Sequence, residues 1–187
     1  VKGKGGHAAS PHLAIDPVVI SAQVISAVQT IISRSTDPVD KALISITKIN
    51  AGTAYNVIDD QVKMGGTIRT FKKETRSYIE KRLRELCNGI AEAHGAEIKI
   101  QFDLVNKYPP TINSKKETIF AANVAKKLVG DDMVITDIDP SMGGEDFSYL
   151  LEEKPGTYLY LGQGDDNHKA HLHTTNYDFN DNLLPVG

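Results

Sequence analysis

The sequence has only one cysteine, Cys87, in 187 residues. A single thiol excludes an internal disulfide framework and is typical of a reducing compartment, so we expect the protein in the cytoplasm. Cys87 lies within an apolar run at helical spacing, which indicates a half-buried helix position and disfavours the alternative of a catalytic thiol. The run consists of Ile79, Leu83, Leu86 and Ile90.

The sequence also has no excess of basic residues. Lys and Arg total 21 against 24 Asp and Glu, for a net charge of −3 and a pI of about 6.1. A nucleic-acid-binding domain needs a basic patch or stripe, so we expect no nucleic-acid partner. No apolar run approaches the length of a membrane span, and residues 1–7 are glycine-rich and basic, unlike a signal peptide. We therefore expect no membrane partner.

The chain lacks an initiator methionine and begins with Val1 in what reads as the end of a strand. This start predicts a fragment of a longer protein. The length suits one or two compact domains. Hydrophobic residues at 40 % and charged residues at 24 % are ordinary for a globular protein.

The first part of the chain alternates between strand and helix patterns. Asp16-Pro17 is a helix start, and Gly95 is well placed to end a second helix. Periodicity predicts helices at about 16–33 and 75–95 and strands at 1–9, 42–49, 61–71 and 98–104. The order β-α-β-β-α-β is that of the ferredoxin-like fold, in the α+β class, and we assign it to residues 1–107.

The second part, residues 108–187, begins at Tyr108-Pro109-Pro110, which cannot continue a strand. Ser114 and Glu117 form a capping-box pattern before a helix that ends at Gly130. We expect a short strand near Met133, a helix opening at Glu145-Asp146 and a strand at 158–161. This part has few strands of its own and reads as an incomplete α/β domain.

Histidines cluster near the end of the chain. His168, His171 and His173 lie close together and are followed by Asp178 and Asp181. A short histidine cluster with carboxylates can bind a metal ion. The alternative interpretation is a solvated loop rich in polar residues.

Three other places could carry chemistry, and each also has a purely structural interpretation. His7 lies among glycines, which leave room for a ligand but also suit a flexible chain end. Arg69 lies on a strand face, where it can bind a carboxylate with two hydrogen bonds or simply face solvent. Gly143 and Gly144 precede Glu145-Asp146, whose acidic side chains are favoured at a helix start by the helix dipole alone.

Together these segments resemble the M20 metallopeptidase and amidohydrolase family, and most closely its hippurate hydrolases, N-acyl-amino-acid amidohydrolases and plant auxin-conjugate hydrolases. The motifs occur in the family's order and cover essentially the whole chain. They are Gly3-Lys4-Gly5-Gly6-His7-Ala8-Ala9-Ser10-Pro11-His12, Asn56-Val57-Ile58, Gly66-Thr67-Ile68-Arg69-Thr70-Phe71, Tyr108-Pro109-Pro110-Thr111, Gly143-Gly144-Glu145-Asp146-Phe147 and Leu172-His173-Thr174-Thr175.

The resemblance implies a two-domain enzyme. Residues 1–107 would be the ferredoxin-like satellite domain, which usually mediates homodimerisation. Residues 108–187 would be the C-terminal part of an α/β metallohydrolase domain. The implied reaction is hydrolysis of the amide bond of small N-acyl amino acids by metal-activated water. The alternative function is a stand-alone satellite module for dimerisation or binding, without catalysis.

The resemblance also implies roles for single residues. His173 matches a metal ligand, and His7 matches a catalytic histidine that reaches the partner subunit's site and stabilises the oxyanion. The implied cofactor is a pair of divalent ions, which can be zinc, manganese, cobalt or nickel. The other ligands and the general base of the family precede the satellite domain, and none is present here. We therefore expect weak or no metal binding by this chain alone.

The remaining matches concern the substrate. Asn56 and Arg69 match residues that hold the substrate, with Arg69 at its free carboxylate. Gly143 and Gly144 match a loop whose backbone borders the substrate.

Overall fold

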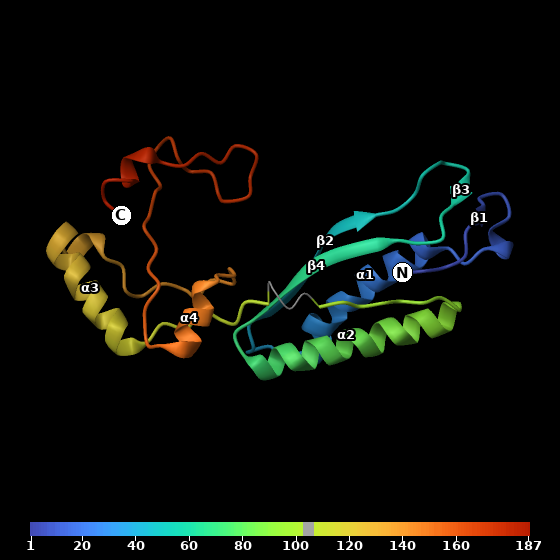
Figure 1. Cartoon of the computed structure of the whole chain (residues 1–187), viewed down its shortest axis with the longest axis horizontal. Helices are drawn as coiled ribbons and strands as arrows, with labels where there is room; N and C mark the ends of the chain where they lie inside the picture. The colour runs from blue at the N-terminus through green and yellow to red at the C-terminus, as the bar shows by residue number, and fades with distance from the viewer. Residues whose placement is uncertain (103–106) are drawn as a thin grey trace. The chain divides into compact units, whose positions relative to one another are not determined.

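The computed structural model describes residues 1–102 and 107–187 (Figure 1). The chain divides into two compact units. The first comprises Val1–Thr111 and Asp137–Tyr149, and the second comprises Ile112–Thr136 and Leu150–Gly187. The predicted division into domains at residue 107 stays a prediction.

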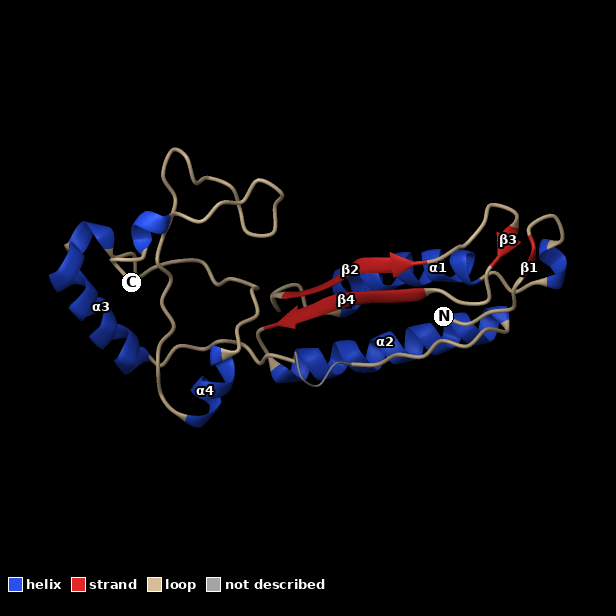
Figure 2. Ribbon diagram, turned by 45° about the horizontal axis from the view of Figure 1, so that its top comes forward, coloured by secondary structure: helices blue, strands red, loops and turns tan. Residues whose placement is uncertain are grey.

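Two helices and an antiparallel strand pair form the body of the first unit (Figure 2). The helices are α1 (Pro17–Thr30), which continues as the π-helical turn η2 (Ile31–Ser35), and α2 (Lys73–His94); the strands are β2 (Ala42–Asn50) and β4 (Lys63–Thr70). Both helices contact the strand pair and each other, and the core lies between them. Its buried members are Val24, Val28, Ile31, Ile44, Ile79 and Cys87.

The local signals at the helix ends are confirmed. The Asp16 carboxylate accepts a hydrogen bond from the Val18 N–H at 2.8 Å, and Gly95 ends α2 with a left-handed φ of 64°. Cys87 lies on α2 as predicted, but it is buried rather than half-buried, with 2 % of its surface exposed. Burial raises the pKa of its thiol, which makes a catalytic role less favourable still.

The predicted strand at 1–9 forms only in short pieces. β1 (Gly6–His7) pairs with β3 (Val57–Ile58), while Lys2 forms isolated bridges to Gln61 and Glu97. Glycines at positions 3, 5 and 6 explain the interruption, because they add no side-chain packing to a continuous strand.

The predicted strand at 98–104 is not formed within the described residues. Glu97 exchanges two backbone hydrogen bonds with Lys2, and residues 98–102 then run on without strand pairing. Ile98 and Ile100 still pack against the core, as their alternation indicated. Residues 103–106 lie outside the described part of the chain.

One helical segment corrects the expectation about apolar runs. Pro17–Ser35 spans 19 residues with a mean hydropathy of 1.3, which is long and apolar enough to cross a membrane by length and composition. In this structure, however, Val24, Val28 and Ile31 from the same segment are buried in the core of the first unit. The core helix of a folded domain can have the same length and composition as a membrane-spanning helix, so these two properties do not distinguish them.

The second unit contains α3 (Lys115–Val129) and part of α4 (Phe147–Glu153), with short 3-10 turns η3 (Asp131–Met133) and η4 (Asp181–Leu183). The helix after Ser114 is confirmed, but the capping box is not. The Ser114 hydroxyl accepts a hydrogen bond from the Gly156 N–H at 3.2 Å instead of capping α3.

The strands predicted near Met133 and at 158–161 are also wrong. Met133 lies in η3, and the backbone of Tyr158 bonds to a side chain instead of a strand. The Asn113 amide accepts from Tyr158 N at 2.7 Å and donates to Tyr158 O at 3.0 Å. An amide side chain thus occupies the positions that a neighbouring strand would use.

Candidate functional site

His7 and Asn56 are brought together by the pairing of β1 with β3. His7 lies opposite Val57, and the Ala8 N–H donates to the Asn56 carbonyl at 3.0 Å. The exposed His7 ring accepts a hydrogen bond at Nδ1 from the Ala9 N–H at 3.0 Å. In the neutral ring the proton is then on Nε2, so His7 presents an N–H donor to its surroundings.

The glycines before His7 are required by backbone packing. A Cβ atom at Gly3 would lie 2.1 Å from the Ile15 carbonyl oxygen, and one at Gly5 would lie 2.9 Å from that of Ile58. Side chains at these two positions would push neighbouring segments apart. The glycines before His7 therefore allow this segment to pack closely against Ile15 and Ile58, and the close packing holds His7 in place.

Arg69 and Gly144 form a second contact, although they are far apart in the sequence. A Cβ atom at Gly144 would lie 2.1 Å from Arg69 Nη1 and 2.6 Å from Cζ, so the guanidinium rests directly against this glycine. Within residues 1–102 and 107–187 the Arg69 side chain has no hydrogen bond or ion pair. Its N–H groups are thus free to bind a carboxylate from outside the chain.

Gly143 lies next to this contact but not in it. Its N–H donates to the Ser141 hydroxyl at 3.1 Å, which shapes the turn before Gly144. Glu145 then directs its carboxylate to the Phe147 N–H at 3.4 Å, at the start of α4. The pKa of Asp146 is raised by a hydrogen bond that its protonated carboxyl group donates to Glu145, and by the negative charge of Glu145. In the sequence, Glu145 and Asp146 are recognisable only as two adjacent acidic residues.

The two pairs of predicted site residues lie apart in the first unit. His7 lies in β1 and Asn56 directly precedes β3, and these two strands lie at one end of the unit. β4, which contains Arg69 just before its last residue, ends at the other (Figures 1 and 2). The structure therefore brings His7 close to Asn56 and Arg69 close to Gly144, but it does not bring these two pairs together.

His173 is exposed on a loop of the second unit and has a φ of 64°. It is the one non-glycine residue in the described ranges with a positive φ, a conformation that costs about 1–3 kcal/mol. No hydrogen bond to its ring is found in the described part of the chain. The ring is therefore available as a ligand.

The other histidines of the cluster do not join His173. The His168 ring bonds through Nδ1 to the Asp165 carboxylate at 2.7 Å, and this bond is the main reason why the pKa of Asp165 is lowered. The described residues contain no group of three potential His, Cys, Asp or Glu ligands. A catalytic zinc needs three protein ligands, so the described residues do not fit a complete metal centre.

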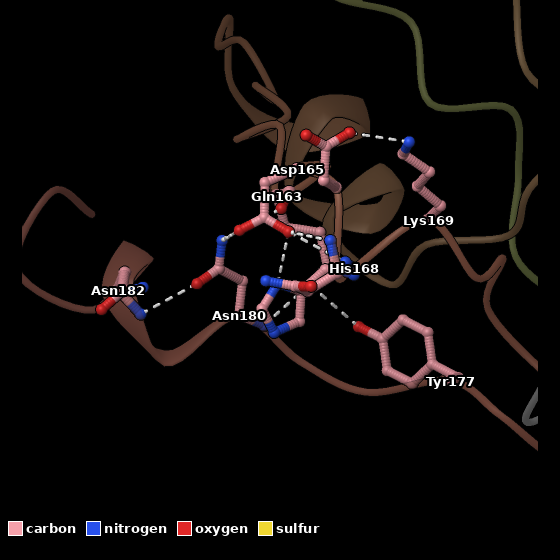
Figure 3. A network of polar contacts seen from close by, with 9 residues as sticks. Gln163, Asp165, His168, Lys169, Tyr177, Asn180 and Asn182 are labelled. Atoms are coloured by element: carbon pink, nitrogen blue, oxygen red, sulfur yellow. Dashed lines mark hydrogen bonds and ion pairs between the residues drawn. The ribbon is translucent and has the colours of Figure 1, made fainter.

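A polar network joins residues 163–165 to residues 177–180, which lie before and after His173 in the sequence (Figure 3). Asn180, which is only 7 % exposed, donates through Nδ2 to Gln163 O at 3.1 Å and to Asp165 Oδ2 at 3.3 Å. Its Oδ1 accepts from the Asn182 N–H at 3.2 Å, and the Tyr177 hydroxyl donates to Gln163 Oε1 at 3.3 Å. Nothing in the spacing of these residues indicated that they would meet.

Comparisons with known proteins place this arrangement in a family. The profile of peptidase family M20/M25/M40 matches residues 5–187. Hippurate hydrolase of Campylobacter jejuni is 38 % identical over 184 residues, which cover 98 % of this chain and 47 % of that protein. IAA-amino acid hydrolase ILR1-like 2 of Arabidopsis thaliana is 36 % identical over 190 residues, covering 100 % and 43 %.

A solved structure agrees. The YXEP protein of Bacillus subtilis, described as a dinuclear metal-binding peptidase from the M20 family, is 31 % identical and superposes with a TM-score of 0.65 over 91 % of this chain and 42 % of its own. This chain thus spans about half the length of the curated relatives that it matches. The motifs and the mixed α/β fold together show that the chain belongs to peptidase family M20/M25/M40.

Proposed function

We propose that this chain is part of a longer metal-dependent amidohydrolase that hydrolyses the amide bond of N-acyl amino acids. The observation that carries the proposal is the Arg69 guanidinium, which rests against Gly144 and has no partner in the described residues. An N-acyl amino acid has a free carboxylate, which a guanidinium binds with two parallel hydrogen bonds. The names of the two curated relatives, which refer to hippurate and to IAA-amino acids, support this class of substrate.

We further propose that the first unit is a ferredoxin-like satellite domain that forms a homodimer. The bridges of Lys2 to Gln61 and Glu97 are antiparallel and support the strand order of that fold. Within the described residues, β2 pairs only with β4 and so has a free edge. The separation of His7 from Arg69 supports a role for His7 in the partner's site, where its Nε2–H would donate to the developing oxyanion.

His173 is proposed as one ligand of a two-metal site that the rest of the longer protein completes. The dinuclear metal-binding relative and the free imidazole of His173 support this assignment. Zinc, manganese, cobalt and nickel are the candidate ions. The single unpaired cysteine, Cys87, supports a location in the cytoplasm.

The test uses the full-length protein. It would be stripped of metal, reloaded with each of the four ions and assayed on a panel of N-acyl amino acids. His173→Ala should lower bound metal and abolish turnover, while His171→Ala, a matched change in the same loop, should retain both. Turnover that is unaffected by metal removal, or that survives in His173→Ala, would overturn the proposal.

A further inference from the structure

A cavity of about 380 Å³ lies in the first unit, beside the start of β2. This volume is at the lower end of the range of about 300–1,000 Å³ that is usual for small-molecule sites. Most of the lining is apolar and comes from η2, the loop after it, the start of β2 and a residue far along the chain. These apolar residues are Ile32, Pro38, Ala42, Leu43 and Met142.

The cavity lies next to Arg69. Leu43 is directly opposite Arg69 in the antiparallel pairing of β2 with β4, so the two side chains point to the same face of the strand pair. Ile44, the next residue of β2, is buried in the core, which places Leu43 and Arg69 on the face away from the core. Met142 is two residues before Gly144, against which the Arg69 guanidinium rests.

Met142 differs from its neighbours in burial. It is half-buried, whereas Ser141, Gly143 and Gly144 are exposed. Among residues 141–144, Met142 alone lines the cavity. A methionine side chain is flexible and polarisable, so it adapts to ligands of different shape. Leu43 and Met142 are therefore the two apolar residues that connect the cavity to the contact of Arg69 with Gly144.

The charged residues of the lining do not select a charged ligand. The Asp40 carboxylate is already bound by Lys72 and by the Thr75 hydroxyl, the latter at 2.8 Å. Asp37 and Lys41 are exposed and opposite in sign, so together they favour neither a cation nor an anion. The apolar lining is left as the part that discriminates between ligands, because burial of apolar surface is favourable.

We propose that Leu43 and Met142 determine specificity for the amino-acid side chain of the substrate, and that the cavity favours an uncharged, apolar side chain such as that of leucine. The inference rests on the proposed function, since it takes Arg69 as the group that binds the substrate carboxylate. In an amino acid, the carboxylate and the side chain are attached to the same carbon atom. A carboxylate held by Arg69 therefore places the side chain within reach of the cavity.

The experiment uses the full-length protein and three compounds with the same acyl group: N-acetyl-leucine, N-acetylglycine and N-acetylglutamate. The ratio of kcat/KM for the leucine and glycine compounds removes everything that the acyl group and the carboxylate contribute. In the wild type it should be about 10 to 100, the range for apolar groups in an apolar pocket. Dissociation constants for the metal-free protein, measured by calorimetry, should give the same order without depending on catalysis.

Variants of the two lining residues test the assignment. Leu43→Ala and Met142→Ala should each lower the leucine-to-glycine ratio by about 5- to 10-fold, because apolar contacts to the leucine side chain are lost. Met142→Lys should raise the ratio of glutamate to leucine by about 10-fold through a new charged hydrogen bond, a gain that structural damage does not produce. Ile49→Ala is the control, since this exposed residue of β2 is outside the cavity lining, and it should keep every ratio.

The outcomes separate this inference from the proposed function. Equal values for the leucine and glycine compounds in the wild type, or a preference for glutamate over leucine, overturn the inference alone. Wild-type ratios in the alanine variants also overturn it. A full-length protein that binds N-acetyl-leucine in preference to N-acetylglycine but hydrolyses neither compound supports the cavity and overturns the proposed function. If Leu43→Ala does not fold, the two Met142 variants decide.

Discussion

At the scale of single residues, the structure gives Arg69 a specific surrounding that its sequence position did not reveal. On a strand face, an arginine is most often a solvated surface residue. Here its guanidinium lies against Gly144, and the described residues offer it no carboxylate. Because the glycine has no side chain, the N–H groups of Arg69 stay accessible to a ligand.

Arg69→Ala in the full-length enzyme should weaken hydrolysis of substrates with a free carboxylate. A lost hydrogen bond to a charged group lowers the specificity constant kcat/KM by about 10- to 150-fold. An amide-capped substrate should be nearly unaffected. Arg82→Ala, which removes an exposed arginine paired with Glu85 on α2, is the control and should leave both substrates unchanged. Equal losses on both substrates in Arg69→Ala would indicate structural damage.

Gly144→Ala should reproduce part of this defect without removing any charge. The new methyl group would overlap with the Arg69 guanidinium, which can swing away because it is the flexible end of the side chain. We expect kcat/KM for carboxylate substrates to fall about 10-fold, the effect of losing one hydrogen bond of about 1.4 kcal/mol, with little change in melting temperature. Gly89→Ala on α2 is the control, since its Cβ would meet no heavy atom within 4 Å. Equal losses in both variants would contradict this explanation.

At the scale of elements, charged side chains on α2 bind Lys107 and Tyr108, which follow α2 in the chain. Glu80 bonds to Arg76 at 3.0 Å and to Lys107 at 2.9 Å, and Arg76 also donates to the Tyr108 carbonyl at 3.4 Å. Partial burial alone raises the pKa of Glu80, but the hydrogen bonds and charges of Lys107 and Arg76 outweigh it, and the pKa falls below its ordinary value. The ionised form of Glu80 is therefore the form that stabilises the fold.

This lowered pKa sets the direction of a pH effect. Its contribution to the free energy of unfolding is present above the unfolded pKa, near 4.5, and is lost as the pH falls through the lower folded pKa. Glu80→Gln should reduce the stability of the protein at pH 7 by about 0.5–1 kcal/mol and weaken its loss on acidification. Urea unfolding between pH 3 and 7 would measure this. Glu92→Gln, an exposed change on the same helix, should leave the pH profile unaltered.

At the scale of the whole molecule, the two units differ in how well they bury apolar side chains. The buried hydrophobic residues of the described chain all lie between Ile20 and Ala91, in the first unit. The apolar face of α3 is open, with Phe120 71 % and Leu128 79 % exposed. Because hydrophobic burial is the main favourable term in folding, the second unit should be the less stable one.

The 187-residue chain alone should therefore be a folded first unit with a loosely ordered second one. Amides of α3 should exchange with solvent much faster than those of α2. With one candidate ligand in place of three, the chain should bind Zn²⁺ weakly and show no hydrolysis of N-acyl amino acids. Hydrogen exchange, calorimetry and a metal-supplemented assay would check this. Turnover that disappears in His173→Ala would show that the site is complete in this chain.

The proposed homodimer predicts rescue between inactive subunits. In a homodimer of the full-length protein, His7→Ala and His173→Ala should each inactivate both sites. A mixed dimer would contain one site with an intact His173 and an intact His7, and it should recover up to about half of wild-type activity. Sedimentation would verify the dimer first. No recovery in a verified mixed dimer would refute the role of His7 across the interface.

The sequence by itself determined the helices of the first unit and the family. Asp16-Pro17 and Gly95 each determine the end of the helix next to them. The helical period of 3.6 residues can likewise be recognised from residues that are close together in the sequence. The ordered motifs identified the family for the same reason, since each is local.

Only the tertiary structure decided which distant residues meet. The strands expected at 1–9 and 98–104 depend on neighbours elsewhere in the chain, and their pairing is limited to short pieces and bridges. The contact of Arg69 with Gly144 and the bridge from Asn180 to Gln163 likewise join segments that no periodicity connects. Such contacts arise from packing and from burial of polar groups, so local patterns cannot predict them.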